Sequence, residues 1–332
     1  MSLSKTTISR RSSLTRLGAI AAVASTATPM DLFAQTSDKP VKFILPVSAG
    51  SGVDGIARAA QNALSKALGQ NVVIENQPGA GGVVGTAAMI KSAPDGLTLS
   101  FVSNNHVIYP SVLKSVPFDP VADITTIAVI GATPLVLVVN PKVPANNAKE
   151  LVALFKANPG KYNYASSGNG TILHLAAEMF KDVTNTFSTH IPYRGFGPML
   201  QDIIGGQVDW GVGALPAVLG QIKSGNLRAI CIPGSQRIAA ALDIPTSVEQ
   251  GFPSYMVEGW FGIVGPKGMS PDLVKRLNAA IVTAFNTPEV KEAMAKQGNT
   301  ISISTPEFAT NHFKSELVKY AALVKKAGVV PQ

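Results

Sequence analysis

The amino-acid sequence predicts an α/β protein built from two lobes. Short apolar, strand-like segments alternate with segments of helical periodicity, which is typical of parallel sheets covered by helices on both faces. The alternation starts again after Pro134, and the composition changes after Pro233. We therefore predict two hinge crossings, a first lobe over residues 36–133 plus 236–332, and a second lobe over residues 134–235, each with a mainly parallel sheet.

The first lobe shows the alternation most clearly. The run from Val41 to Pro46 is rich in β-branched residues and predicts a buried strand. Glycine-rich sequence follows, and the helical periodicity after it stops at Gly69, a typical helix end. The remaining elements predicted up to residue 102 are strands over 72–75 and 97–102, a helix over 83–91, and a turn at 94–96.

The rest of the chain repeats this pattern. We predict a further strand over 127–130 at the end of the first lobe's first segment. In the second lobe we predict strands over 135–139, 162–165, 208–213 and 227–232, and helices over 148–157, 170–180 and 198–204. After residue 233 we predict a strand over 260–264 and helices over 272–285, 288–297 and 306–326.

Composition excludes several classes of protein. The 332 residues are 46% hydrophobic and 14% charged, so the chain can bury a large core and is not disordered. The single cysteine, Cys231, can form neither an intramolecular disulfide nor a zinc or iron–sulfur cluster, and its apolar neighbours predict a buried thiol. No spacing of histidines and acidic residues indicates a metal site.

The N-terminus has the features of an export signal. Arg10 and Arg11 form a twin-arginine-like pattern, and an apolar run over 17–24 precedes small residues at Ala27 and Ala34. We predict a signal over residues 1–34, cleaved after Ala27 or Ala34, with export by the twin-arginine or the Sec route to the periplasm. The run is shorter than the roughly 20 residues of a membrane span, so the mature chain is not expected to insert into a membrane.

The charge distribution argues against nucleic-acid binding. The formal charge of +8 includes four basic residues and one acidic residue of the predicted signal. The remaining charges are scattered, and no stripe of Lys and Arg with interleaved aromatic residues occurs.

The first glycine-rich loop allows three interpretations. Residues 50–55 match G-x-G-x-x-G, and Glu75 lies 20 residues beyond Gly55, as in dinucleotide-binding proteins. This would make the chain an exported nicotinamide-dependent oxidoreductase, but Asp54 places a carboxylate among the amides that pyrophosphate needs. Alternatively, the amides at the start of the helix bind a small anion such as a carboxylate. In the third interpretation Asp54 only caps the helix and the glycines form a tight turn.

Two further loops are rich in glycine, hydroxyl or amide residues. The glycine cluster over 79–85 has Val84 where the third glycine of the fingerprint belongs, so a structural role is favoured. The loop over 165–171 joins a strand to a helix and carries hydroxyl and amide side chains, which predicts a second anion site. A serine hydrolase is the enzymatic alternative, but the loop lacks the G-x-S-x-G pattern. His174, three residues after Thr171, is either part of this site or an ordinary helix histidine.

Several motifs together resemble one family over nearly the whole mature chain. They lie at residues 46–54, 57–58, 73–82, 93–96, 164–171, 174–178, 192–195 and 205–209. In order and spacing they look like the extracytoplasmic solute-binding receptors of the tripartite tricarboxylate transporter family, also called Bug proteins. The resemblance implies a type II-like periplasmic binding fold that closes over an organic acid and delivers it to membrane permease subunits. It implies neither an enzymatic activity nor a cofactor nor a metal.

The resemblance also implies where the ligand binds. Its carboxylate would be held by the loop after the first strand and by the Ser/Thr-rich loop of the second lobe. The predicted ligand-binding residues are Ser48, Ala49, Gly50, Ser51, Gly52, Asp54, Ser103, Asn104, Asn105, Ser166, Ser167, Gly168, Asn169, Gly170, Thr171, His174, Tyr193, Arg194 and Ala214. Residues 47–49 and Arg194 depart from the usual pattern, so the acid stays open between aliphatic di- or tricarboxylates, aromatic acids and acidic amino acids.

Overall fold

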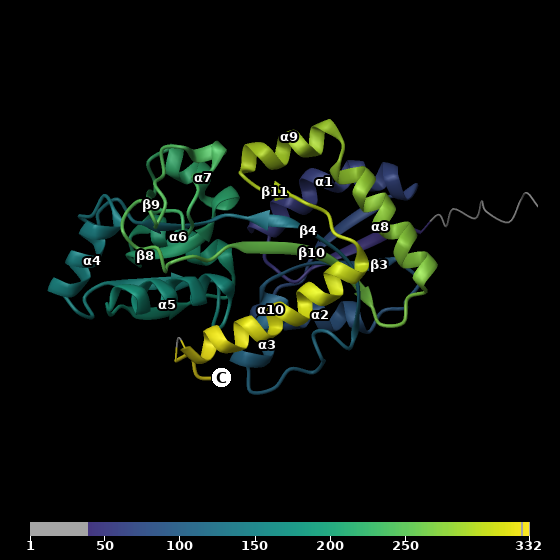
Figure 1. Ribbon diagram of the computed structural model, residues 1–332, viewed down its shortest axis with the longest axis horizontal. Coiled ribbons are helices and arrows are strands. Elements are labelled where there is room, and N and C mark those ends of the chain that lie inside the picture. The colour runs from purple at the N-terminus through teal and green to yellow at the C-terminus, as the bar shows by residue number, and fades with distance from the viewer. Residues whose placement is uncertain (1–38, 327, 332) are drawn as a thin grey trace, which may run out of the picture. The chain divides into compact units, whose positions relative to one another are not determined.

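The computed structural model describes residues 39–326 and 328–331 (Figure 1). The predicted export signal, residues 1–34, lies outside the described residues. Two mixed β-sheets, each flanked by helices, organise the chain. We call the first sheet with its helices the first lobe, and the second sheet with its helices the second lobe.

The six-stranded sheet of the first lobe has the order β11-β4-β10-β3-β1-β2. Its strands are β1 (Val41–Leu45), β2 (Val72–Asn76), β3 (Thr98–Ser103), β4 (Ile124–Thr133), β10 (Gly259–Pro266) and β11 (Thr300–Ile301). Its helices are α1 (Gly52–Leu68), α2 (Val83–Ile90), α3 (Asn105–Val112), α8 (Pro271–Phe285), α9 (Pro288–Gln297) and α10 (Pro306–Lys326), with a 3₁₀ turn η1 (Ala80–Gly82). Strands β1, β2 and β3 run parallel, whereas β10 is antiparallel to both β3 and β4.

The five-stranded sheet of the second lobe has the order β7-β6-β8-β5-β9. Its strands are β5 (Leu135–Val139), β6 (Asn163–Ser166), β7 (Thr189–Pro192), β8 (Trp210–Ala214) and β9 (Arg228–Cys231). Its helices are α4 (Ala148–Ala157), α5 (Ile172–Thr184), α6 (Phe196–Gly205) and α7 (Leu215–Lys223), and a 3₁₀ turn η2 (Ala239–Ala241) follows β9. Strand β6 is parallel to β7 and β8, and β5 is antiparallel to β8 and β9.

The predicted two-lobed α/β fold is confirmed, but the sheets are mixed where we expected mainly parallel ones. The chain leaves the first sheet at Pro134, between β4 and β5, and returns to it in β10. Two neighbouring strands run parallel only when a long crossover connects them. Strand β10 arrives from the other lobe and has no such crossover within the first sheet, and it runs antiparallel to its neighbours. The lobe bounds, 36–133 plus 236–332 and 134–235, stay a prediction.

Aromatic side chains fill both cores. In the first lobe the ring centroids of Phe43 and Phe101 are 5.2 Å apart, and those of Phe101 and Phe285 are 6.4 Å apart. Trp210 is fully buried in the second lobe and contacts Phe155 and other rings. Cys231 is buried as predicted, and burial raises the pKa of its thiol to about 12. Within the described part of the chain, no helix is both long and apolar enough to span a bilayer.

The C-terminal helix links the lobes a third time. It packs on β4 of the first lobe, where the hydroxyls of Thr126 and Thr310 are 2.5 Å apart. At its other end, Lys326 Nζ lies 3.4 Å from Asp182 Oδ2 of α5. Asn104, directly before α3, donates to the Tyr320 hydroxyl of the same helix.

Candidate functional site

A cavity of about 490 Å³ has walls from both lobes. The first lobe contributes the loop after β1, the loop over 78–82 and residues 103–105 after β3. The second lobe contributes the loops after β6 and β7 and the end of β8. Thr133, Leu135, Gly259 and Trp260, from the strands that join the lobes, complete the wall. The site thus lies beyond the carboxyl ends of the parallel strands, where open α/β sheets bind ligands.

Four helices begin at this cavity: α1 at Gly52, α3 at Asn105, α5 at Ile172 and α6 at Phe196. The N–H groups of a helix's first turn have no partner within the helix and carry a partial positive charge. Several helix N-termini around one cavity favour an anionic ligand.

The Asp54 carboxylate fixes the loop after β1 by hydrogen bonds. This carboxylate is 4% exposed and accepts hydrogen bonds from Gly50 N–H (3.0 Å), Arg58 Nε (3.0 Å) and Asn76 Nδ2 (2.9 Å). Burial alone would raise the pKa of Asp54, but these hydrogen bonds together lower it below its usual value. Ser51 is the N-cap of α1, since its side chain accepts from Asp54 N–H at 3.3 Å. The expectation that Asp54 caps the helix is therefore wrong.

We expect Asp54→Asn to lower the free energy of unfolding by about 1.5–3 kcal/mol at pH 7, because a charge-assisted network is lost. The folded-state pKa of Asp54 lies below its unfolded value, so this contribution is present above roughly pH 4 and disappears as the pH falls through the folded-state pKa. Denaturant unfolding of both proteins from pH 7 to about pH 2 measures the difference.

Glu292→Gln is the matched control, because Glu292 and Lys296 also form an i,i+4 ion pair but are exposed. It should leave stability unchanged. Equal losses for the two variants would contradict a special role of Asp54.

The loop over 78–82 was not among the predicted site residues, yet it forms part of the wall. Gly82 has φ +125°, and a Cβ there would lie 2.1 Å from the Tyr109 hydroxyl oxygen and 2.8 Å from the Pro46 carbonyl oxygen. These glycines therefore combine the structural role that the sequence favoured with a place on the cavity wall. Only their packing against Pro46 and Tyr109, distant in sequence, brings them to the site.

Hydrogen bonds to its own residues and to neighbouring histidines hold the loop after β6 in shape. The Ser166 hydroxyl lies 2.6 Å from His190 Nε2, and the Thr171 hydroxyl donates to the Gly168 carbonyl at 2.9 Å. Gly170 N–H donates to His174 Nδ1 at 3.0 Å. Most donors of this loop are thus engaged in holding its shape.

Two neutral histidines support this loop from behind. The rings of His174 and His190 stack at 4.0 Å between centroids, and Tyr164 stacks on His190 at 4.7 Å. Burial lowers the pKa of His174 to about 4 and that of His190 to about 3. Both rings are uncharged at neutral pH and serve as packing and hydrogen-bonding groups.

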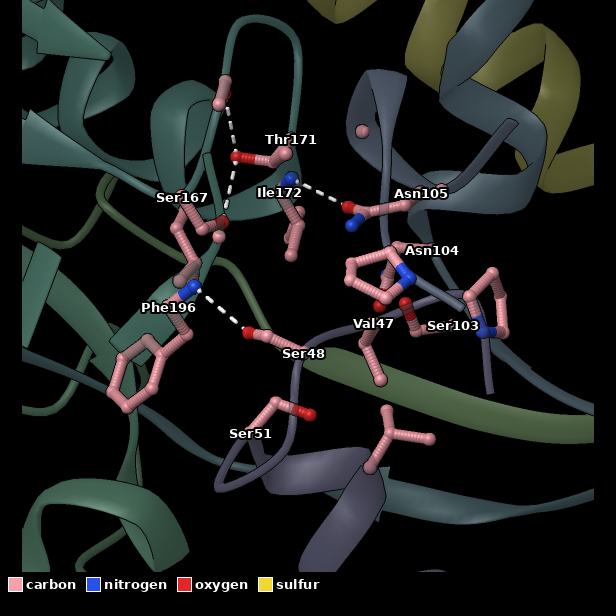
Figure 2. A pocket seen from close by; sticks show the side chains of 18 of the residues that line it. Val47, Ser48, Ser51, Ser103, Asn104, Asn105, Ser167, Thr171, Ile172 and Phe196 are labelled. Carbon is pink, nitrogen blue, oxygen red and sulfur yellow. Dashed lines mark hydrogen bonds between the residues drawn. The ribbon is translucent and has the colours of Figure 1, made fainter. Parts of the chain in front are cut away.

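Two hydrogen bonds join the lobes beside the cavity. Phe196 N–H, at the start of α6, donates to Ser48 Oγ at 3.2 Å. Ile172 N–H, at the start of α5, donates to Asn105 Oδ1 at 2.8 Å (Figure 2). First-lobe side chains therefore cap second-lobe helices directly.

Arg194 is the only charged residue on the cavity wall among the described residues. It is exposed, lies directly before Gly195, and forms no ion pair within the described part of the chain. The neighbouring Tyr193 donates its hydroxyl to Asp202 at 2.7 Å. Among the described residues the wall carries no carboxylate, so their contribution to its electrostatic character is positive.

We expect Arg194→Ala to weaken ligand binding by less than about tenfold, because solvent screens an exposed guanidinium. Arg194→Lys, which keeps the charge, should bind almost as wild type. Calorimetry at two salt concentrations measures both, and a loss above a hundredfold would mean that a guanidinium–carboxylate pair anchors the ligand.

The structure brings many of the predicted residues together. Those on the cavity wall are Ser48, Ser51, Gly52, Ser103, Asn104, Asn105, Ser167, Gly168, Asn169, Thr171, Tyr193, Arg194 and Ala214. The predicted residues that do not line the cavity are Ala49 and Gly50, which are exposed, and Asp54, Ser166, Gly170 and His174, which are buried. The polar members of the second group face the interior of their own loops, as Asp54 and His174 do.

The geometry of the first loop does not suit a dinucleotide. Glu75, the acidic residue expected at the ribose, pairs with Lys42 at 2.8 Å. Gly50 N–H already has the Asp54 carboxylate as acceptor. No group of histidine, cysteine and acidic residues within the described ranges could hold a metal ion.

Fold and site together define a two-lobed solute-binding protein. The chain belongs to the family of receptors described as "Tripartite tricarboxylate transporter family receptor", whose model matches residues 56–329, and this confirms the resemblance drawn from the motifs. Protein BugT of Bordetella pertussis is 36% identical over 314 residues, covering 94% of this chain and 96% of BugT.

Two solved structures show the same fold. Rpa4515 of R. palustris with adipate is 26% identical with a TM-score of 0.86, covering 89% of this chain and 99% of that one. MatC from Rhodopseudomonas palustris with bound malate is 26% identical with a TM-score of 0.81, covering 86% and 99%.

Proposed function

We propose that this protein captures a small organic acid between its lobes, in the periplasm, and delivers it to the membrane subunits of a tripartite tricarboxylate-type transporter. One observation carries the proposal: four helix N-termini and one arginine, with no carboxylate, surround a cavity between two lobes. Oriented amide dipoles bind a carboxylate without a full counter-charge. The relatives solved with adipate and malate support an acid as the ligand.

In this proposal the two lobes close around the ligand. Ser48 with Phe196 and Asn105 with Ile172 join the lobes next to the cavity, so a ligand that fits would stabilise the same arrangement. Closure would also present a surface that a membrane partner can distinguish from the open form. Catalysis has no role in this cycle, and no group on the wall is arranged as a nucleophile with its base.

A thermal-shift screen of the protein without residues 1–34 tests the proposal. Mono-, di- and tricarboxylates, aromatic acids and acidic amino acids form the panel, since a bound ligand raises the apparent stability. Small-angle scattering with a hit should show a smaller radius of gyration. A panel without hits, or a hit without compaction, would contradict capture by lobe closure.

A further inference from the structure

A second and larger cavity adjoins the strands that join the lobes, and we call it the rear groove. Its volume is about 950 Å³, and it is lined by residues within 129–135, 232–239, 256–260 and 295–302 and by one face of α10. Leu135, Gly259 and Trp260 line both the rear groove and the ligand cavity. In Figure 1, β10 runs between the lobes, with α9 above it and α10 below it.

The order of the strands places the two cavities on opposite sides of the joining strands. In the first sheet, β1 and β3, whose loops line the ligand cavity, lie on one side of β4 and β10, and β11 lies on the other. In the second sheet, β6, β7 and β8 lie on one side of β5, and β9 lies on the other. The rear groove is lined by Asn299 and Thr300 at β11 and by Ile232 and Pro233 directly after β9. A hinge rotation that brings the lobes together at the ligand cavity therefore moves them apart at the rear groove.

The lobes are joined at the ligand cavity in this structure. Phe196 N–H donates to Ser48, and Ile172 N–H donates to Asn105 of the other lobe. The rear groove has its volume of about 950 Å³ in this same arrangement. Separation of the lobes at the ligand cavity would narrow it. The groove is thus open to a partner in the arrangement that a bound ligand stabilises.

Three polar groups on the groove wall have no partner among the described residues. The exposed Glu258 carboxylate forms no ion pair there. Asn299 is 8% exposed, and its Oδ1 accepts no hydrogen bond, although its amide NH₂ donates to Gln297 at 2.9 Å. His312 Nε2 is also without a partner. Buried polar atoms in folded proteins normally have hydrogen-bond partners, so these groups indicate an occupant that supplies donors.

The groove wall has a negative charge to spare. Its two cations within the described chain are already paired, Arg237 with Glu249 at 2.9 Å and Lys319 with Glu316 at 2.8 Å. Partial burial raises the pKa of the Glu258 carboxyl, and Lys319 offsets only part of this rise. A cationic group beside Glu258 would compensate its charge.

Two large apolar side chains are exposed on the same wall. Met256 is 52% exposed and Phe308 is 59% exposed, and both line the groove. Exposed apolar side chains that gather at a groove with polar groups around them are typical of protein interaction sites. A partner with apolar side chains of its own would cover them.

The width of the groove suits a stretch of several residues. Thr300 and Trp260 pair with Ala132 from opposite sides, so they are two strand spacings, roughly 10 Å, apart. Asn299 and Glu258 precede them at the same end of these strands. A single ion or ammonium group cannot satisfy both, whereas a protein segment can reach both with different residues.

We propose that the rear groove binds a segment of a protein partner in which a basic residue lies next to large apolar residues, and that it does so when the lobes are joined around the ligand. The basic side chain would pair with Glu258, an N–H group would donate to Asn299, and the apolar side chains would contact Met256 and Phe308. This inference rests on the proposed function and assigns the segment to the membrane subunits of the transporter. A partner that binds only the joined arrangement distinguishes the loaded receptor from the empty one.

A charge reversal in the groove separates docking from ligand binding. In cells that produce Glu258→Lys in place of the wild-type chain, uptake of the panel acid with the largest thermal shift should fall at least tenfold. Calorimetry on the purified variant should show the wild-type affinity for that acid within about twofold. Phe308→Ser should give the same pair of results. Asp272→Lys reverses an exposed acidic residue of α8 outside the groove and should change neither quantity.

Two outcomes of this experiment overturn the inference and leave the proposed function intact. One is wild-type uptake with Glu258→Lys and Phe308→Ser, and the other is a loss of acid affinity as large as the loss of uptake. If no acid binds the wild-type protein, or if uptake does not need it, the proposed function itself fails.

Photocrosslinking identifies the occupant of the groove. With p-benzoylphenylalanine in place of Phe308, we expect a crosslink to a membrane subunit that forms at least tenfold more with the acid than without it. The same group in place of Phe187, which is 58% exposed and not on the groove wall, should give no such crosslink. Mass spectrometry should place the crosslink in a segment with Lys or Arg next to large apolar residues. Equal yields with and without the acid, or no membrane subunit in the product, would contradict the assignment.

Discussion

Gly52→Val should abolish ligand binding, lowering the affinity a hundredfold or more, while the protein stays folded. Gly52 is the first residue of α1, and a Cβ there would lie 2.9 Å from the Ala214 Cβ of the second lobe. A branched side chain would both cover the free amides at the start of α1 and prevent α1 from approaching Ala214. Each lost charge-assisted hydrogen bond costs roughly 1.5–3 kcal/mol, and steric exclusion adds to this cost.

Smaller substitutions separate the loss of the free amides from the steric contact with Ala214. Gly52→Ala alone should weaken binding by its contact with Ala214, and adding Ala214→Gly should restore most of the affinity. Gly55→Ala, in the same helix and with open space around its added Cβ, should bind as wild type. Calorimetry and circular dichroism measure affinity and fold. Normal binding by folded Gly52→Val would remove the α1 terminus from the site.

The local part of this site could be predicted from the sequence. A strand predicted to end at residue 46, glycines and serines after it and a helical period from residue 56 place amide donors at a helix start. The same reasoning identified the loop over 165–171. In both loops the chemistry depends on residues adjacent in sequence, so spacing alone was informative.

The features of the site that could not be predicted depend on contacts between residues that are distant in sequence. Asp54 bonds to Asn76 of β2, and this contact turns the carboxylate away from the cavity. Gly259 and Trp260 are ordinary strand residues that reach the wall only because β10 returns from the other lobe. Helix α3 was not predicted because Pro110 lies inside it, and its packing against α10 overrides that unfavourable residue.

The sequence also could not predict which acceptors the donors of residues 166–171 bind. The hydroxyl and amide residues of 166–171 predict an anion site, but His174 and His190, which brace this loop, lie on α5 and β7. Whether a serine donates to a ligand or to its own loop depends on these neighbours. The Ser166 and Thr171 hydroxyls are consequently engaged in holding the shape of the loop.

Gly170→Ala is expected to weaken ligand binding by at least tenfold, because it separates the lobes at the loop after β6. Gly170 has φ +69°, where an alanine costs roughly 1–2 kcal/mol. A Cβ there would also lie 2.1 Å from Val112 Cγ2 of α3, so the first lobe would have to move away. Since Gly170 N–H donates to His174 Nδ1, the loop cannot easily shift to relieve the contact.

Gly168→Ala distinguishes the contact between lobes from backbone strain. Gly168 also has a positive φ, +136°, but a Cβ there would come no closer than 3.5 Å to the nearest atom, the Tyr193 carbonyl oxygen. Both variants should lose stability in denaturant unfolding, whereas only Gly170→Ala should lose affinity strongly in calorimetry. Adding Val112→Ala to Gly170→Ala should recover affinity but not the stability lost to strain. If the two single variants lost affinity equally, the shape of the loop, and not the approach of α3 to it, would control ligand binding.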